Sequence, residues 1–339
     1  MDRDMEKLRN LIFRLCAAPG GSGEESSALR AARKELEPYG TIRTDALGNL
    51  IAEMGSPDAE EHVLLDAHLD QIGWIVTRID SAGFLRVGPC GGMDRRVLPG
   101  SPVRVCGRET LCGIVCVPSD GENTDKVPPV DKMAVDAGLS KEEAERLAAP
   151  GDRVFFACEP KQLIGTRVSA AGLDDRAGVA ALIRCAQLLA GEKLGCRLTI
   201  LCSTREEIGG QGAVTGAFAA APTQAIAVDV SFAMQPGAPE ENCGTLGGGP
   251  MIGVAPILDR KMGETLFAAA RRLNLPYKAD VMGGKTGTNS DAIAVSRAGV
   301  RTALLSIPQR SMHTPAEVVD LRDVENTARL LAEYVRGVK

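Results

Sequence analysis

Aromatic side chains are scarce in this sequence of 339 residues, where they make up 3% of the chain and include a single tryptophan, Trp74. So few rings are a poor basis for stacking on nucleic-acid bases and equally poor for stacking on sugars. The formal net charge is −5, and no cluster of lysine and arginine offsets it. An acidic chain without a basic patch argues against nucleic acid as a main partner.

Long apolar runs and paired cysteines are also missing. No apolar stretch approaches the ~20 residues of a membrane span, and the charged start 1–7 lacks the apolar core of a secretory signal. None of the ten cysteines belongs to a C-x-x-C pair, so neither a zinc finger nor a thioredoxin motif is indicated. We expect a cytoplasmic protein with no membrane partner, whose cysteines, Cys112 and Cys202 among them, are free and buried.

The length exceeds the usual size of a single core, so two domains are expected. Residues 1–71 and 165–339 show the alternating helical and strand patterns of an α/β domain. Residues 72–164 instead contain short strands between Gly and Pro turns, and one helix that opens with a capping box of Ser140 and Glu143. We predict a catalytic domain with a mixed, largely parallel sheet flanked by helices, and an inserted β-rich barrel domain at 72–164.

Short apolar runs in the catalytic domain precede acidic and imidazole groups. Such runs predict buried parallel strands, and active sites in open α/β sheets lie outside the carboxyl ends of the strands. The four runs are 62–66, 198–202, 225–228 and 302–307, and the groups that follow them are His68, Asp70, Glu206, Glu207, Asp229 and His313. A further pair, Asp174 and Asp175, opens a helix. This is the composition of a two-metal hydrolytic site.

The spacing of these residues suggests individual roles. His68 and Asp70 are two residues apart and point the same way in an extended chain, so Asp70 can orient the imidazole. The sequence has only three histidines, and His62, which begins its strand, is expected to be structural. The adjacent residues Glu206 and Glu207 project in different directions, so one can bind a metal while the other acts as general base.

Each remaining motif has a plain structural interpretation beside the functional one. Asp174 could simply cap its helix, but a carboxylate there can also bridge two cations. Asp229 follows apolar neighbours, where an unpaired carboxylate is costly to bury. His313 precedes Thr314 and Glu317, a capping-box pattern that predicts a helix start at this point.

A glycine-rich stretch at 282–291 suggests a phosphate-binding loop. The required spacing fails because Ala279 stands where that motif needs glycine. We expect a loop that lies close to the substrate.

Five blocks in this order resemble the co-catalytic di-metal aminopeptidases of the tetrahedral, self-compartmentalising type. This group is often called glutamyl or deblocking aminopeptidase, and sometimes endoglucanase M. The resemblance covers nearly the whole chain, the insert included. The matching blocks are 66–70 (Asp-Ala-His-Leu-Asp), 172–176 (Gly-Leu-Asp-Asp-Arg), 204–209 (Thr-Arg-Glu-Glu-Ile-Gly), 228–229 (Val-Asp) and 306–315, which ends in Met-His-Thr-Pro.

The resemblance implies two divalent metal ions per subunit, with zinc expected first and cobalt or manganese as alternatives. His68, Asp174 and Asp229 would hold one ion. The second would be held by Asp174, Glu207 and His313, so that Asp174 bridges. The resemblance also makes Glu206 the general base and Asp70 the residue that clamps His68, and it suggests a cis peptide between Asp174 and Asp175.

The function implied is removal of N-terminal residues from short peptides by a metal-activated water. The resemblance also implies a homo-oligomer in which the insert at 72–164 makes dimers and the dimers join into a dodecamer. Two positions depart from the family pattern: Gln71 replaces the usual Glu, and Ser311 replaces the usual Tyr. Neither position is a metal ligand in the family, so the reaction class implied by the resemblance is unchanged. The two replacements do put the substrate preference in question.

Two other functions remain open from the residues. An N-acyl amino acid deacylase would use the same di-metal site. A metal-binding assembly protein with a degenerate site belongs to a different class, and the intact Glu206 argues against it. A glycosidase is disfavoured, because its two carboxyl groups must stand about 5–9.5 Å apart across the bond, whereas the obvious acidic pair here is contiguous.

Overall fold

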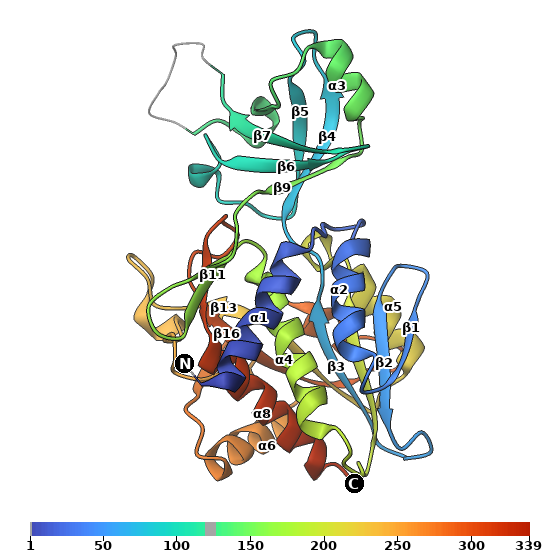
Figure 1. Ribbon diagram of the computed structural model, residues 1–339. Coiled ribbons are helices and arrows are strands. Elements are labelled where there is room, and N and C mark those ends of the chain that lie inside the picture. The colour runs from blue at the N-terminus through green and yellow to red at the C-terminus, as the bar shows by residue number, and fades with distance from the viewer. Residues whose placement is uncertain (1, 119–126) are drawn as a thin grey trace.

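The computed structural model describes residues 2–118 and 127–339. The remaining residues, 1 and 119–126, lie outside this description, and 119–126 fall within the predicted insert. Figure 1 shows two parts, a larger α/β part that carries both termini and a smaller β-rich part above it.

The larger part is built on a mixed eight-stranded sheet, as predicted. Its four central strands, β12, β3, β13 and β16, run parallel, and antiparallel strands flank them on both sides. The strands lie in the order β1 (Thr41–Thr44), β2 (Leu50–Gly55), β12 (Arg197–Ser203), β3 (His62–His68), β13 (Gln224–Phe232), β16 (Arg301–Gln309), β14 (Met251–Val254) and β15 (Lys278–Val281).

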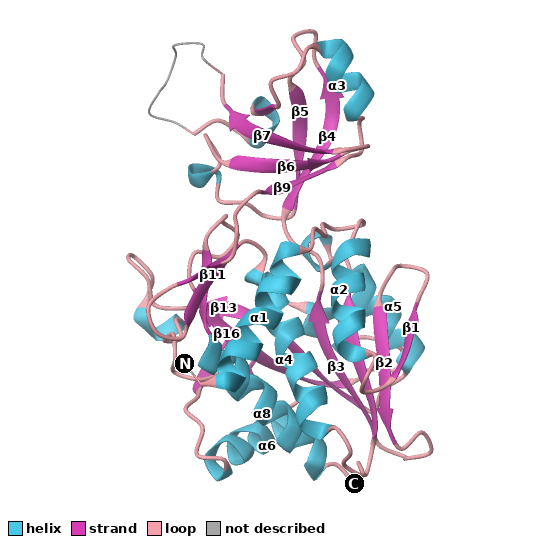
Figure 2. Cartoon of the chain, viewed as in Figure 1, coloured by secondary structure: helices cyan, strands magenta, loops and turns pink. Residues whose placement is uncertain are grey.

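Helices cover both faces of this sheet (Figure 2). One face packs against α1 (Arg3–Ala17), α2 (Ser26–Leu36), α4 (Leu173–Leu189), α6 (Arg260–Arg272) and α8 (Leu321–Gly337). The other face packs against α5 (Gln211–Ala220) and α7 (Asn289–Ala294).

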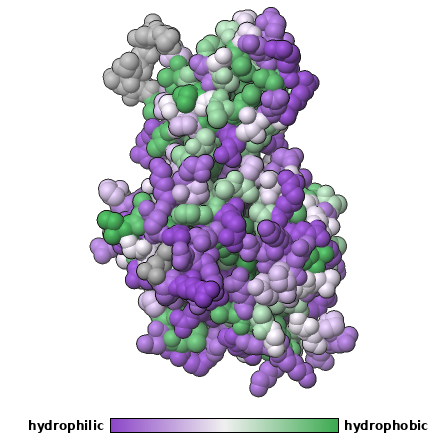
Figure 3. Space-filling view, viewed as in Figure 1, coloured by the Kyte–Doolittle hydropathy of each residue, from purple (hydrophilic) through white to green (hydrophobic). Residues whose placement is uncertain are grey.

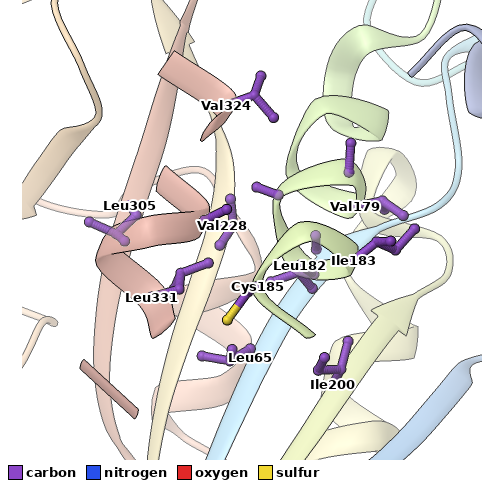
Figure 4. Close-up of a cluster of buried hydrophobic side chains, with 14 of the residues drawn as sticks. Leu65, Val179, Leu182, Ile183, Cys185, Ile200, Val228, Leu305, Val324 and Leu331 are labelled. Atoms are coloured by element: carbon purple, nitrogen blue, oxygen red, sulfur yellow. The ribbon is translucent and has the colours of Figure 1, made fainter. Parts of the chain in front are cut away.

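The main core lies between α4, α8 and the central strands (Figure 4). Leu182 and Cys185 of α4 face Leu331 of α8 over Leu65 and Val228 of the sheet, and all five side chains are buried. The strands are apolar along most of their length because both faces are covered. Polar residues therefore collect at the strand ends, where the chain leaves the core.

The smaller part is a closed barrel. Its strands are β4 (Gly73–Ile79), β5 (Leu85–Cys90), β8 (Ala134–Asp136), β7 (Thr110–Cys116), β6 (Pro102–Cys106) and β9 (Arg153–Phe156), and α3 (Lys141–Leu147) packs beside them. Closure gives each barrel strand a paired neighbour on both sides, which reduces the exposed strand edges. The capping box expected at Ser140 and Glu143 is present.

A three-stranded sheet packs against α4 and β16 of the larger part. It consists of β10 (Lys161–Gln162), β11 (Arg167–Ala170) and β17 (Glu317–Asp320). Strand β10 lies within the predicted insert but pairs with β11 outside it. We propose that 1–71 and 165–339 form the catalytic domain and 72–164 the insert, with this short sheet as their junction.

Two expectations about local structure are wrong. The helix predicted after Thr314 does not form there: residues 317–320 are β17, and α8 begins at Leu321 with Asp320 as its N-cap. All ten cysteines are free, as expected, but burial was expected too widely: Cys112 is exposed on the outer face of β7 and five others are half-buried. The buried cysteines are Cys185, Cys196, Cys202 and Cys243. Among the described residues, no helix is long and apolar enough to cross a membrane.

Candidate metal centre and active site

The candidate residues meet at the carboxyl ends of the parallel strands. His68 ends β3, directly beside Ser203 at the end of β12. Asp229 lies near the end of β13. Glu206 and Glu207 form a short 3-10 turn that follows β12. Because neighbouring parallel strands end at one edge of the sheet, residues far apart in sequence share one site.

Asp174 stands between two imidazoles. Its Oδ1 lies 3.1 Å from Nε2 of His68, and its Oδ2 lies 3.2 Å from Nε2 of His313. Asp229 Oδ1 is 4.0 Å from the same nitrogen of His68, and Glu207 Oε2 is 3.5 Å from that of His313.

These contacts define two groups whose ligand atoms lie within 4.8 Å of one another: His68, Asp174 and Asp229, and Asp174, Glu207 and His313. The structure thus brings together all five residues expected to bind metal.

Burial disfavours the ionised form of the carboxylates in the site unless a positive charge lies nearby. It raises the pKa values of Glu207 and Asp229 well above their usual range, and the charge of Asp174 adds to this effect. The pKa of Asp174 is also subject to burial, but the imidazoles of His313 and His68 outweigh it and lower that pKa. A cation would therefore stabilise the ionised form of these carboxylates.

Asp70 is fully buried and connects several parts of the site. Its carboxylate accepts hydrogen bonds from the backbone N–H groups of Glu206 at 2.9 Å and Glu207 at 3.2 Å, and from the Ser22 hydroxyl at 2.7 Å. The closest partner of Nδ1 of His68 is the backbone carbonyl of Asp70 at 2.9 Å, while the carboxylate lies 3.6 Å away. Asp70 therefore holds the glutamate turn with its side chain and the imidazole mainly with its backbone.

Glu206 is half-buried, and burial is the first cause of its raised pKa. The positive charge of His68 opposes this shift, and the negative charges of Asp174 and Asp70 add to it. The charges of the cluster therefore affect the pKa of the Glu206 side chain, while the hydrogen bond to Asp70 fixes its backbone.

A cis peptide joins Asp174 to Asp175, as the resemblance suggested. Asp175 is buried, and its Oδ1 accepts the backbone N–H of Gly178 at 2.9 Å. This bond holds the start of α4 beside the site.

Glu317 has a different place from the one predicted by its capping-box pattern. Its carboxylate is buried and accepts the backbone N–H groups of His313 at 3.0 Å and Asp174 at 3.2 Å. The pairing of β17 with β11 overrides the local helix signal and turns this side chain toward the site. Nothing in the local sequence distinguishes this use of a Thr-x-x-Glu pattern from a helix cap.

The barrel also reaches the site, a contact that the sequence did not indicate. A Cβ added to Gly91 would lie 3.2 Å from Glu207, and one added to Gly92 would lie 3.3 Å from Nδ1 of His313. Both glycines directly follow β5, so a loop of the barrel packs against two residues of the second group.

Arg176 is another residue that the structure places near the site. Its guanidinium is fully buried and donates hydrogen bonds to four backbone carbonyls, those of Leu15, Ala18, Gly20 and Leu69. Leu69 lies between His68 and Asp70, so this cation ties the end of β3 to the N-terminal segment.

Other singled-out residues lie apart from the two groups. His62 contacts Thr199 at 2.8 Å at the opposite end of β3 and is structural, as expected. In the glycine-rich stretch, Asn289 is buried and donates a hydrogen bond to Asp66, which lies on β3 two residues before His68. Gln71 packs against Gly172, whereas Ser311 is exposed.

The fold is shared with known peptidases. The family model for M42 glutamyl aminopeptidases matches residues 48–330. The chain belongs to this family. The M42 enzyme described here is accordingly a peptide hydrolase, and its family is the one indicated by the sequence blocks.

Individual relatives resemble this chain in sequence or structure over nearly their full lengths. The lysyl aminopeptidase of Pyrococcus furiosus is 32% identical, with 97% of each chain covered. An aminopeptidase from the archaeon Desulfurococcus kamchatkensis has a solved structure with a TM-score of 0.94 and 31% identity, covering 99% of this chain and 96% of its own. The TET1 peptidase of Pyrococcus horikoshii, described as assembling into a tetrahedron or a large octahedral shell, has a TM-score of 0.87 at 30% identity, with 98% and 100% covered.

Proposed function

We propose that this M42 peptidase is a metal-dependent aminopeptidase that hydrolyses N-terminal residues from short peptides. The observation that carries the proposal is the position of Asp174, whose two carboxylate oxygens face the imidazoles of two separate groups. A carboxylate shared between two sets of nitrogen and oxygen ligands is typical of a two-metal hydrolytic site.

The residues present fit two divalent ions. Each group combines one imidazole with two carboxylates, a donor set that suits zinc, with cobalt and manganese as alternatives. Within the described residues, the buried Oε1 of Glu207 has no hydrogen-bond partner, which fits a role as ligand. When bound, two such ions would polarise the scissile carbonyl and lower the pKa of the attacking water.

Glu206 is the general base in this proposal. Its side chain accepts the proton of the attacking water and passes it to the nitrogen of the departing amine. The bond from its backbone N–H to Asp70 holds it beside Glu207.

The experiment combines metal content with turnover. Purified protein should contain two ions per subunit, lose activity on chelation and regain it with zinc, cobalt or manganese, measured on a panel of aminoacyl-arylamides. Glu206→Gln should keep both ions but lose roughly 10²–10⁴-fold in turnover. Glu142→Gln, an exposed change on α3, is the matched control and should leave turnover unaltered. Full activity without metal, or a fully active Glu206→Gln, would reject the proposal.

The same panel, extended with N-acetyl amino acids, separates the other functions considered. Hydrolysis of N-acetyl amino acids without cleavage of free N-terminal residues would indicate a deacylase. Two bound ions without any turnover would indicate an assembly protein with a degenerate site.

We also propose that the enzyme works as a homo-oligomer, most simply a dodecamer with two-fold contacts through the barrel domain. Support comes from the likeness to TET1 peptidase. Barrel closure removes the need to cover open strand edges, but Ile114 and Val117 remain exposed. Figure 3 shows hydrophobic residues gathered over the barrel, whereas the larger part is mostly hydrophilic on this face. Light scattering should give about twelve subunits, and a stable active monomer would contradict this.

The cytoplasmic location stays a prediction.

A further inference from the structure

Glu317 joins two candidate ligands from different parts of the chain without contributing a ligand atom itself. Its Oε1 accepts the backbone N–H of His313, and its Oε2 accepts that of Asp174. Asp174 lies at the start of α4, and His313 lies in the turn after β16. Both belong to the group that also contains Glu207.

The surroundings of Glu317 make this link rigid. The side chain is 1% exposed, and Glu317 pairs with Ala170 where β17 runs along β11. Strand β11 leads within a few residues to Asp174, while the chain before β17 leads back to His313. Among the described residues no cation forms a salt bridge with Glu317, so backbone N–H groups are its partners.

We propose that Glu317 is a positioning residue that sets the distance between Asp174 and His313 and thereby controls occupancy of the second metal site. This proposal rests on the two-ion function above. A carboxylate offers two acceptors to two donors, whereas an amide offers one acceptor and turns its own N–H₂ toward the other donor. Asp174 belongs to both groups, but the other two ligands of the first group, His68 and Asp229, form no hydrogen bond with Glu317 in the described residues. The first group should therefore depend on Glu317 less than the second, in which His313 is also held.

The test compares two buried carboxylates of the same kind. Asp323 on α8 is also fully buried and also accepts two backbone N–H groups, those of Gly247 and Gly249, both at 2.7 Å. It lies outside both metal groups. Glu317→Gln and Asp323→Asn therefore make matching chemical changes, but only the first alters the link between Asp174 and His313.

Full-length, metal-loaded protein is dialysed against increasing chelator, and the ions left per subunit are counted by mass spectrometry. Wild type and Asp323→Asn should release their two ions over the same range. Glu317→Gln should release one ion at 10- to 100-fold lower chelator strength, the usual size of such indirect effects, and keep the other within about threefold of wild type. Added Co²⁺ should restore its turnover, which a merely structural defect would not allow.

The outcomes separate the two proposals. If wild type holds fewer than two ions, the proposed function fails, and the role of Glu317 fails with it. If wild type holds two ions and Glu317→Gln retains both equally well, or loses both together, only the role of Glu317 is overturned. Glu317→Asp keeps the charge but withdraws the carboxylate by one methylene. It should show a smaller selective loss, and it decides the question if the amide variant does not fold.

Discussion

The Ser22 hydroxyl donates a 2.7 Å hydrogen bond to the carboxylate of Asp70, and so ties the loop before α2 to the turn that carries Glu206. The carbonyl of Ser22 in turn accepts a hydrogen bond at 3.2 Å from the guanidinium of Arg153 in barrel strand β9. A continuous chain of hydrogen bonds therefore runs from the barrel to the proposed base.

Ser22→Ala should weaken this chain. Asp70 would lose its only side-chain donor other than the imidazole in the described residues, and hydrogen bonds to charged groups contribute about 1.5–3 kcal/mol. We expect both metal ions to remain while turnover falls about tenfold, measured together with the melting temperature. Ser26→Ala is the control, because Ser26 makes a bond of equal length to Glu24 on the exposed surface. Equal behaviour of the two variants would contradict the role of Ser22.

Gly91→Ala should impair catalysis by crowding the site. An added Cβ would lie 2.8 Å from Cγ2 of Ile72 and 3.2 Å from Glu207, so the barrel loop or the carboxylate must shift. Small displacements of a catalytic group can cost up to roughly 10²-fold in rate.

Gly100→Ala is the matched control for Gly91→Ala. Both glycines have positive φ, 85° and 77°, and so incur a similar backbone cost of about 1–2 kcal/mol. An added Cβ at Gly100 meets nothing within 4 Å. Values of kcat/KM should fall only for Gly91→Ala, and similar losses in both would mean that backbone strain alone is responsible.

Arg176→Lys should destabilise the fold although it keeps the charge. The guanidinium fork serves four carbonyls at once, whereas an ammonium has three donors on one atom and cannot reach them all. Leaving buried carbonyls without donors should lower the free energy of unfolding by at least about 3 kcal/mol, measured by denaturant titration. Arg336→Lys, which alters a partly exposed pair with Glu192, should change it by less than about 1 kcal/mol. A loss at Arg176 no larger than this would contradict the role given to its fork.

His62 should make stability depend on pH. Burial lowers the pKa of its imidazole to about 4, with the charge of Arg197 as the next cause. An unfolded chain takes up this proton near pH 6.5, so protons favour the unfolded state between about pH 6.5 and 4. Stability should therefore fall as pH falls through this window, by on the order of 2 kcal/mol from this residue.

Removal of the imidazole isolates that contribution. His62→Gln should flatten the curve of unfolding free energy against pH between about pH 4 and 6.5. If its curve runs parallel to that of wild type, another group is responsible for the acid sensitivity.

Much of the fold and of the site could be predicted from local patterns. The central strands are apolar because both sheet faces are covered, and the same burial pushes His68, Asp229 and the glutamate pair to the strand ends. A period of two and short Gly and Pro turns likewise indicated the barrel. Such features depend on residues that are near one another in the chain, so they can be recognised in a single sequence.

Contacts between distant segments were decided only by the tertiary structure. Thr314 and Glu317 have the local signature of a helix start, yet pairing of β17 with β11 places the carboxylate between His313 and Asp174. The sequence by itself determined which groups can bind metal and which strands bring them to one edge. Which buried groups hold them there followed from packing, because a hydrogen-bond partner more than a hundred residues away leaves no periodic trace in the chain.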